Sequence, residues 1–282
     1  MRGVQGWFGE EHCVDIRVVA PALRWTAASE LGGVGDGGTF NVTRSAFVPC
    51  VSTFLLEAED TSVGVNGSNV TVESPYSVVI EPVGDVPSRV TFVDDGRGRV
   101  TRMRLNYAPA RGDEGRSDTV CFRARDALGV AVLPTSCVTL RVKRCAYCIG
   151  EGDTLQSVTR KLAMDFNWMR LWLANGNEDG DPETTTIEHP DVLMDKAGTY
   201  VINVGSIYHV EKGDTLHLLA KTYQTTMRDL LSVNPDLEYA GHDAETMLLQ
   251  VGHEMCIMPC TVPIPKLPQE VMDRLALPSE EL

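Results

Sequence analysis

Cysteines are the residues of this sequence whose spacing offers the most definite chemistry. There are eight of them. Cys145-x-x-Cys148 and Cys256-x-x-x-Cys260 have spacings that a four-thiolate zinc site tolerates. An even number of cysteines in an oxidising compartment instead indicates a framework of disulfides. We prefer the disulfides, and we predict neither a metal ion nor a cofactor.

Residues for catalysis are not arranged in any pattern that a known reaction needs. His253-Glu254 lacks the second histidine, four residues on, that a zinc protease helix requires. The sequence contains no Gly-x-Ser-x-Gly motif or phosphate loop. Paired acids such as Asp94-Asp95 stand among glycines, where solvated turn residues are the simpler explanation. The sequence therefore predicts a protein that is not an enzyme.

Charge and hydropathy exclude two further classes of partner. The formal net charge is −14, and the acidic excess lies almost entirely after residue 144. Such a surface repels phosphate backbones, so we expect no nucleic-acid binding. Apolar runs are all too short to cross a bilayer, so we expect no membrane span.

Three Asn-x-Ser/Thr sites accompany the cysteines, at Asn41, Asn66 and Asn69. Together they favour an extracellular or cell-surface glycoprotein. Residues 1–13 contain no apolar signal segment, so we expect any signal to lie upstream. Residues 13–19 echo residues 137–143, and this predicts that residues 1–19 are the last strand of a preceding β repeat.

Residues 20–144 show short alternating stretches separated by turn residues, which predicts an all-β sandwich. In the last two strands Cys121 and Cys137 face outward on neighbouring strands, where they can bond. The stretch from Val120 to Asp126 followed by Gly129 resembles the immunoglobulin-like or cadherin-like repeats of large cell-surface proteins. The side chains expected to face inward are Val120, Phe122, Ala124, Val138, Leu140 and Val142.

From residue 145 onward the apolar period changes to that of helices, and one unit occurs twice. Its start is Tyr147 to Leu155 in the first copy and Tyr208 to Leu216 in the second. Each start reads as a strand, a glycine turn and a helix, with Asp153 and Asp214 placed to cap the helices. Two apolar helical stripes and a closing strand follow. The pattern predicts two β-α-α-β units.

The second unit resembles the LysM family along its length, in its aromatic residue, its Gly-Asp-Thr-Leu start and its Asn234-Pro235. The first unit is similar, but it has extra residues between its helices and an acidic insertion at Glu178 to Glu188. The expected organisation is therefore multidomain, an all-β immunoglobulin-like sandwich followed by two α+β modules. The expected ranges are 20–144 for the sandwich, 145–205 and 206–262 for the modules, and 263–282 for a Pro-rich acidic tail.

The LysM resemblance implies a shallow groove that holds N-acetylglucosamine-containing glycans, between the loop after the first strand and the loop after the second helix. The loop Leu237 to Gln250 of the second unit is longer than in the family. By similarity to cysteine pairs that flank LysM modules in plant receptors, Cys145 and Cys148 are expected to bond with Cys256 and Cys260, which leaves Cys13 and Cys50 as a possible pair. The glycan-binding residues implied are Gly152, Asp153, Thr154, Leu155, Asp191, Val192 and Leu193 in the first unit, and Gly213, Asp214, Thr215, Leu216, Thr246, Met247 and Leu248 in the second.

These expectations combine into a non-enzymatic extracellular protein that binds or cross-links chitin-like or peptidoglycan-like glycans. The alternative is a structural glycoprotein subunit of an extracellular filament or surface hair. In that case the LysM-like and immunoglobulin-like faces would contact other extracellular protein subunits.

Overall fold

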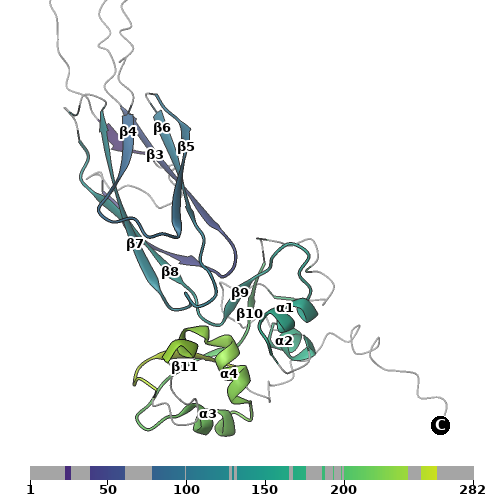
Figure 1. The fold of residues 1–282 in the computed structure, drawn as a ribbon. Helices are drawn as coiled ribbons and strands as arrows, with labels where there is room; N and C mark the ends of the chain where they lie inside the picture. Colours follow the sequence, from purple (N-terminus) through teal and green to yellow (C-terminus); the bar gives the residue numbers. More distant parts are fainter. Residues whose placement is uncertain are drawn as a thin grey trace, which may run out of the picture.

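The fold of this chain is a β-sandwich with two small helical units at one end, as Figure 1 shows. The computed structural model describes residues 23–26, 39–60, 78–98, 100–126, 129, 132–164, 168–175, 186–187, 193, 198, 200–240 and 249–258. The predictions for residues 1–19 and for the 263–282 tail lie outside these residues. The same is true of Asn66, Asn69, Cys13 and Cys260.

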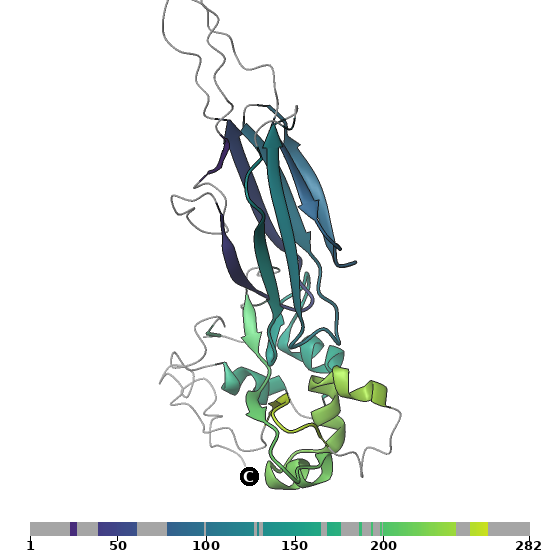
Figure 2. The ribbon, with the colours of Figure 1, turned by 90° about the vertical axis from the view of Figure 1, so that its left-hand side faces the viewer.

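The sandwich consists of two four-stranded sheets whose strands run along the long axis of the molecule (Figure 2). All neighbouring strands are antiparallel except β2 and β8, which are parallel. This order is that of the immunoglobulin fold, with β2 as an extra strand beside β8. One sheet has the order β1 (Leu23–Trp25), β3 (Ser52–Asp60), β6 (Val100–Tyr107) and β5 (Val90–Gly96), and the other β2 (Asn41–Ala46), β8 (Ser136–Val142), β7 (Ser117–Asp126) and β4 (Val78–Val83).

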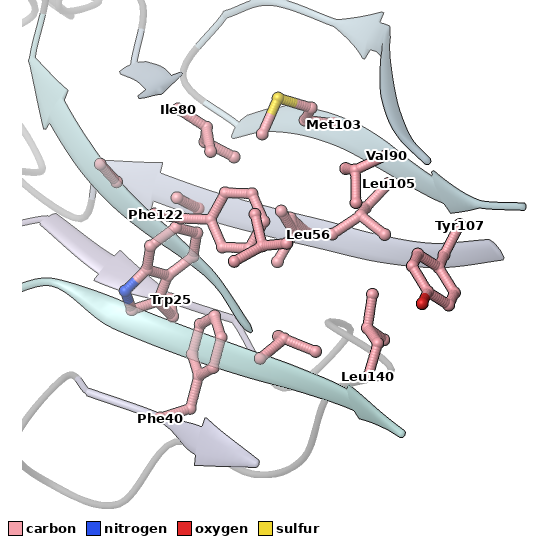
Figure 3. Close-up of a cluster of buried hydrophobic side chains, with 14 of the residues drawn as sticks. Trp25, Phe40, Leu56, Ile80, Val90, Met103, Leu105, Tyr107, Phe122 and Leu140 are labelled. Carbon is pink, nitrogen blue, oxygen red and sulfur yellow. The ribbon is translucent and has the colours of Figure 1, made fainter. Parts of the chain in front are cut away.

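The sandwich core forms where alternate side chains of both sheets face each other, as Figure 3 shows. The six residues predicted to face inward on β7 and β8 are all buried, with exposures of 1% or less. Aromatic rings meet edge-on across the core, with Phe92 and Phe122 centroids 5.8 Å apart and Trp25 and Phe40 centroids 5.2 Å apart. The period-two pattern of the sequence therefore predicted the buried face correctly.

The two helical units follow the sandwich, and each has the predicted order of strand, helix, helix and strand. In each unit the two strands pair antiparallel. None of the helices in the described part of the chain is long and apolar enough to cross a membrane. The first helical unit has β9 (Ala146–Cys148), α1 (Leu155–Lys161), α2 (Trp168–Ala174) and β10 (Val201–Asn203), and the second has β11 (Ser206–His209), α3 (Leu216–Thr222), α4 (Met227–Val233), a 3₁₀ turn (Pro235–Ala240) and β12 (Glu254–Ile257).

The six cysteines in the described part of the chain form three disulfides. Cys121 and Cys137 are register partners on β7 and β8 and are bonded, as the alternation predicted. Cys145 is bonded to Cys256, which joins the start of the first helical unit to the end of the second. The expected pair of Cys13 with Cys50 is wrong, and so is the expected bond of Cys148 to the end of the second unit, because Cys50 is bonded to Cys148.

The Cys50–Cys148 disulfide has a local cause. The amide of Cys148 donates to the Val48 carbonyl at 2.8 Å, so β9 starts beside the segment that joins β2 to β3. The two cysteines therefore lie close although they are 98 residues apart in sequence. A zinc site would need free thiolates at Cys145, Cys148 and Cys256, and all three are in disulfides.

Ion pairs join the second helical unit to the sandwich. Arg144 donates to both carboxylate oxygens of Asp236, at 3.0 and 2.7 Å, and its side chain is only 7% exposed. Arg141 on β8 contacts Glu254 on β12 at 3.1 Å. Arg111 donates to the Ser232 carbonyl. These contacts and the disulfides fix the position of the helical units against the end of the sandwich.

Candidate functional site

The turn between β11 and α3 is the most clearly built feature of the second helical unit. The Asp214 carboxylate accepts hydrogen bonds from the Glu211 amide and the Tyr208 hydroxyl, both at 2.7 Å. Gly213 takes a φ of +95°, a conformation that glycine adopts without strain. Thr215 begins the helix, and its hydroxyl accepts from the Leu218 amide at 3.1 Å.

The first helical unit contains the same turn between β9 and α1. The Asp153 carboxylate accepts from the Gly150 amide at 2.8 Å and from the Tyr147 hydroxyl at 3.3 Å. Thr154 caps the helix, and Ser157 completes a reciprocal capping box with it. The equivalent residues of the two turns are separated by the same number of positions along the chain.

The prediction that Asp153 and Asp214 cap the helices is wrong. Each carboxylate folds back onto the amide three residues before it and onto the tyrosine of the first strand. The helix caps are the threonines that follow, Thr154 and Thr215, which have the extended backbone of a cap residue. The aspartates therefore stabilise the shape of the turn, while the threonines start the helices.

An asparagine at the end of the second helix ties each unit together on the other side. In the second unit Asn234 donates to the carbonyls of Leu230 and Cys256, both at 2.7 Å, and accepts from the Cys256 amide at 2.6 Å. In the first, Asn175 makes the same three bonds, to Leu171 and to both main-chain groups of Asn203. Sequence reasoning treated Asn234 as a helix end and missed this role. The signal was available, because both copies carry asparagine at this point.

Other main-chain hydrogen bonds also correspond between the two units, which shows that they share a backbone plan. Ala163 and Gln224 end their helices in the same left-handed conformation, with φ of +51° in both. Three main-chain hydrogen bonds of the first unit have counterparts in the second. The bond from Val158 N to Thr154 O matches Leu219 N to Thr215 O, and Met164 N to Thr159 O matches Thr225 N to Ala220 O. The bond from Gly198 N to Ile149 O matches Gly252 N to Val210 O.

Comparison with protein families identifies the second helical unit. The family model described as LysM domain matches residues 208–257. Residues 208–257 are a LysM domain. A search of curated proteins gave no match.

Several solved structures are similar to part of the chain. The N-terminal Ig1-2 module of the Drosophila receptor protein tyrosine phosphatase DLAR is 17% identical, with a TM-score of 0.22, and the match covers 44% of this chain and 49% of that one. The titin domains z1z2 in complex with telethonin are 14% identical, with a TM-score of 0.25 and coverage of 46% and 52%.

An endo-fucoidan hydrolase of glycoside hydrolase family 107 is 12% identical, with a TM-score of 0.27. That match covers 42% of this chain but only 14% of the hydrolase. The chain thus spans about half the length of the DLAR and titin structures and a small part of the hydrolase. With TM-scores this low, these likenesses carry no argument about function.

The predicted glycan-binding residues differ in what they present to solvent. Gly152 and Gly213 are exposed at the tips of their turns, while Thr154, Asp214 and Thr215 are partly buried. Four of the predicted residues are buried with exposures of 2% or less, so their side chains cannot reach a ligand: Asp153, Leu155, Leu193 and Leu216. Asp191, Val192, Thr246, Met247 and Leu248 lie outside the described residues.

Hydrogen bonds to the turn carboxylates shift pKa values in both turns. Burial raises the pKa of the Asp153 carboxyl, but hydrogen bonds from Lys161, the Gly150 amide and the Ser157 hydroxyl outweigh it, and the pKa lies below its ordinary value. In the LysM domain the hydrogen bond to the Asp214 carboxylate raises the pKa of Tyr208 to about 12. Both carboxylates are thus occupied within their own turns.

Leu218 is a residue near the turn of the LysM domain that sequence reasoning overlooked. It lies at the third position of α3, directly beyond the Thr215 cap, and is 46% exposed. The equivalent residue of the first helical unit is Ser157, which is engaged in the capping box. The surface beside the turn is therefore apolar in the LysM domain and polar in the first helical unit.

Proposed function

We propose that this chain is a non-enzymatic extracellular protein that binds or cross-links N-acetylglucosamine-containing glycans, such as chitin-like or peptidoglycan-like material. The single observation that carries the proposal is the LysM domain at residues 208–257, with its glycine turn exposed. Catalysis is not part of the proposal, since LysM and immunoglobulin-like domains are typically binding modules.

We further propose that the first helical unit is a second LysM module. Its support is the shared backbone plan: the Asp turn, the threonine cap and the asparagine clamp recur with matching hydrogen bonds. Two modules in one chain would let it contact two positions of a glycan, which raises the effective affinity without new contacts. This arrangement suits cross-linking.

The proposed contacts are mainly those of the exposed main chain of the two turns. A neutral glycan carries amide and hydroxyl groups, which pair with main-chain groups and do not need a charged partner. Asp153 and Asp214 act indirectly in this proposal, by holding the turns in shape. In the LysM domain Leu218 offers an apolar surface beside the turn for the methyl group or ring face of a sugar. The segments 191–193 and 246–248 complete the proposed groove.

The extracellular assignment is supported by the three disulfides, which fit an oxidising compartment. It is also supported by Asn41, the first residue of β2, which is exposed together with Thr43 of the same glycosylation site. We propose that a glycan is attached at Asn41, and also at Asn66 and Asn69.

The test is calorimetric titration of the full chain with a soluble N-acetylglucosamine oligomer, using a blocking substitution in each turn. Gly213→Asn and Gly152→Asn each place a side chain in open space above a turn, and asparagine is among the side chains that a positive φ strains least. Each is expected to raise the Kd at its own site by about tenfold or more. Gly84→Asn is the matched control, because Gly84 has a similar φ of +83° and open space but lies in a turn of the sandwich.

The outcomes separate the two modules. If only Gly213→Asn weakens binding, the LysM domain alone is the site and the proposal for the first helical unit is wrong. Absence of binding by the unmodified chain at millimolar oligomer would overturn the glycan proposal altogether.

The alternative function is assembly of an extracellular filament or surface hair. It is supported by the contact in which Arg144 and Arg141 of the sandwich end bind Asp236 and Glu254. A contact between a face of the LysM domain and the end of the sandwich thus occurs within this chain. This function predicts concentration-dependent self-association in sedimentation experiments together with a failure to bind the oligomer.

A further inference from the structure

Two of the disulfides overlap in sequence in a way that shortens the covalent route through the chain. Cys50–Cys148 closes a loop with a sequence separation of 98, and Cys145–Cys256 closes one of 111. Cys145 lies inside the first loop, three residues before its end. A covalent route from the segment before Cys50 to the segment after Cys256 therefore crosses both disulfides and uses only residues 145–148 between them.

We infer that this chain is a load-bearing link, in which the two disulfides carry tension past most of the sandwich and most of both helical units. A loop whose ends are joined covalently cannot be drawn out by pulling on the chain outside it. The joined residues have Cα atoms 5.7 Å apart in one disulfide and 5.2 Å apart in the other. Residues 51–144 and 149–255 lie off the loaded route.

The strands that do lie on the route are positioned to resist the load. Among the described strands, only β1 and β2 precede Cys50. β2 pairs parallel with β8 from Asn41 opposite Cys137 to Ala46 opposite Val142, and both strands run toward the bonded cysteines. β8 itself lies off the route but joins it at Cys145, so tension that enters β2 at its start acts along this ladder and loads its hydrogen bonds together.

The inference goes beyond glycan binding and does not depend on it. The turns that begin at Gly150 and Glu211 both lie within the segments that carry no load. A chain held at one end and pulled at the other therefore cannot draw out either turn, although β9, which carries Tyr147, lies on the route. The interface ion pair of Arg144 with Asp236 is likewise off the route.

The third disulfide provides an internal control. Cys121–Cys137 has a sequence separation of 16 and lies entirely inside the loop that Cys50–Cys148 closes. Its removal leaves the loaded route unchanged. It has the same chemistry as the other two, so substitution of its cysteines reports on any general effect of losing a disulfide.

The experiment is single-molecule stretching of the full chain between its two ends, without reductant, at a force that unfolds every loaded segment. All molecules carry Cys13→Ser and Cys260→Ser, so that only the three disulfides remain. At about 3.6 Å per residue the fully stretched length is expected to be about 300 Å. Addition of reductant is expected to release the whole chain, at about 1,000 Å.

Paired serine substitutions assign the route. Replacing Cys50 and Cys148 is expected to add about 270 Å to the stretched length, since Cys121–Cys137 still closes its own loop. Replacing Cys145 and Cys256 is expected to add about 380 Å. Replacing Cys121 and Cys137 is expected to add nothing. An unmodified chain that reaches about 1,000 Å without reductant overturns the inference, as does a Cys121 and Cys137 variant that lengthens like the other two. The reductant step on the unmodified chain reads the same route without relying on the folding of any variant.

Discussion

Asn234 makes three buried hydrogen bonds in the LysM domain. It is fully buried, and its amide group bonds three main-chain groups, from the end of α4 to β12. Asn175 has the same arrangement in the first helical unit. Each asparagine thus joins the second helix of its unit to the closing strand.

Asn234→Ala is expected to lower the free energy of unfolding by about 3 kcal/mol, because it leaves buried main-chain groups unpaired. Equilibrium denaturation in urea with the disulfides intact measures this. Asn106→Ala is the control, since Asn106 accepts one exposed hydrogen bond from Thr53, and its loss is expected to cost under about 1 kcal/mol. Equal effects of the two substitutions would contradict the role given to Asn234.

Asp153 makes the stability of the first helical unit dependent on pH. Its pKa is lower in the folded chain than its ordinary value of 3.8. Its contribution is therefore complete above pH 3.8 and is lost as the pH falls through the lowered folded value. We expect the unfolding free energy to fall in this acid range, and Asp153→Asn to flatten the fall. Glu57 and Glu81 also have lowered pKa values, through Thr26 and Arg102 and through Arg123 and Arg125, so part of the acid dependence remains.

At the scale of the elements, the two first helices start differently. α1 begins with a reciprocal capping box in which Thr154 and Ser157 each bond the other's amide. α3 has only the single bond from the Leu218 amide to Thr215, because leucine cannot return a hydrogen bond. The same fold therefore tolerates an exposed apolar side chain at this position in one unit.

Thr154→Ala is expected to cost about 1 to 2 kcal/mol of unfolding free energy, and Thr215→Ala about 1 kcal/mol. Thr154→Ser and Thr215→Ser retain the hydroxyl and serve as matched controls with little expected loss. Hydrogen exchange of the Ser157 and Leu218 amides provides a local measurement. Slow exchange that persists in the alanine variants would argue against the caps.

The elements themselves followed from sequence, while the links between them did not. Alternation of Val120, Phe122 and Ala124 identified the buried face, because side chains in a strand alternate strictly. Sequence predicts the turn aspartates as caps because aspartate is a good cap in general. In the structure each carboxylate instead accepts from the amide three residues before it. The partner of Cys50 could not be deduced, because pairing depends on how β9 meets the sandwich.

At the scale of the whole molecule, two arginines at the end of the sandwich contribute differently to the contact with the LysM domain. Arg144 is 7% exposed and binds both oxygens of Asp236, which is 20% exposed. Arg141 and Glu254 are 48% and 30% exposed. Buried charges that lose a partner are costly, whereas exposed pairs are screened by water and salt.

Arg144→Met is accordingly expected to destabilise the chain by about 3 kcal/mol, by leaving Asp236 without its main partner. Arg141→Met is expected to cost under about 1 kcal/mol. Thermal unfolding of both variants in low and high salt tests this, because only the Arg141 effect should disappear with salt. A larger loss for Arg141→Met would show that the contact is organised differently.

The parallel pairing of β2 with β8 also determines a sequence of events during synthesis. β2 contains Asn41, and its neighbour Phe40 bonds Ser136 across a sequence separation of 96. At ordinary rates of translation β8 emerges about 5 to 20 s after β2. During that delay Asn41 has no strand beside it, so an oligosaccharide attached there, as proposed above, would be added to a flexible chain before the ladder closes. The sandwich would then be completed with the sugar at Asn41 already attached.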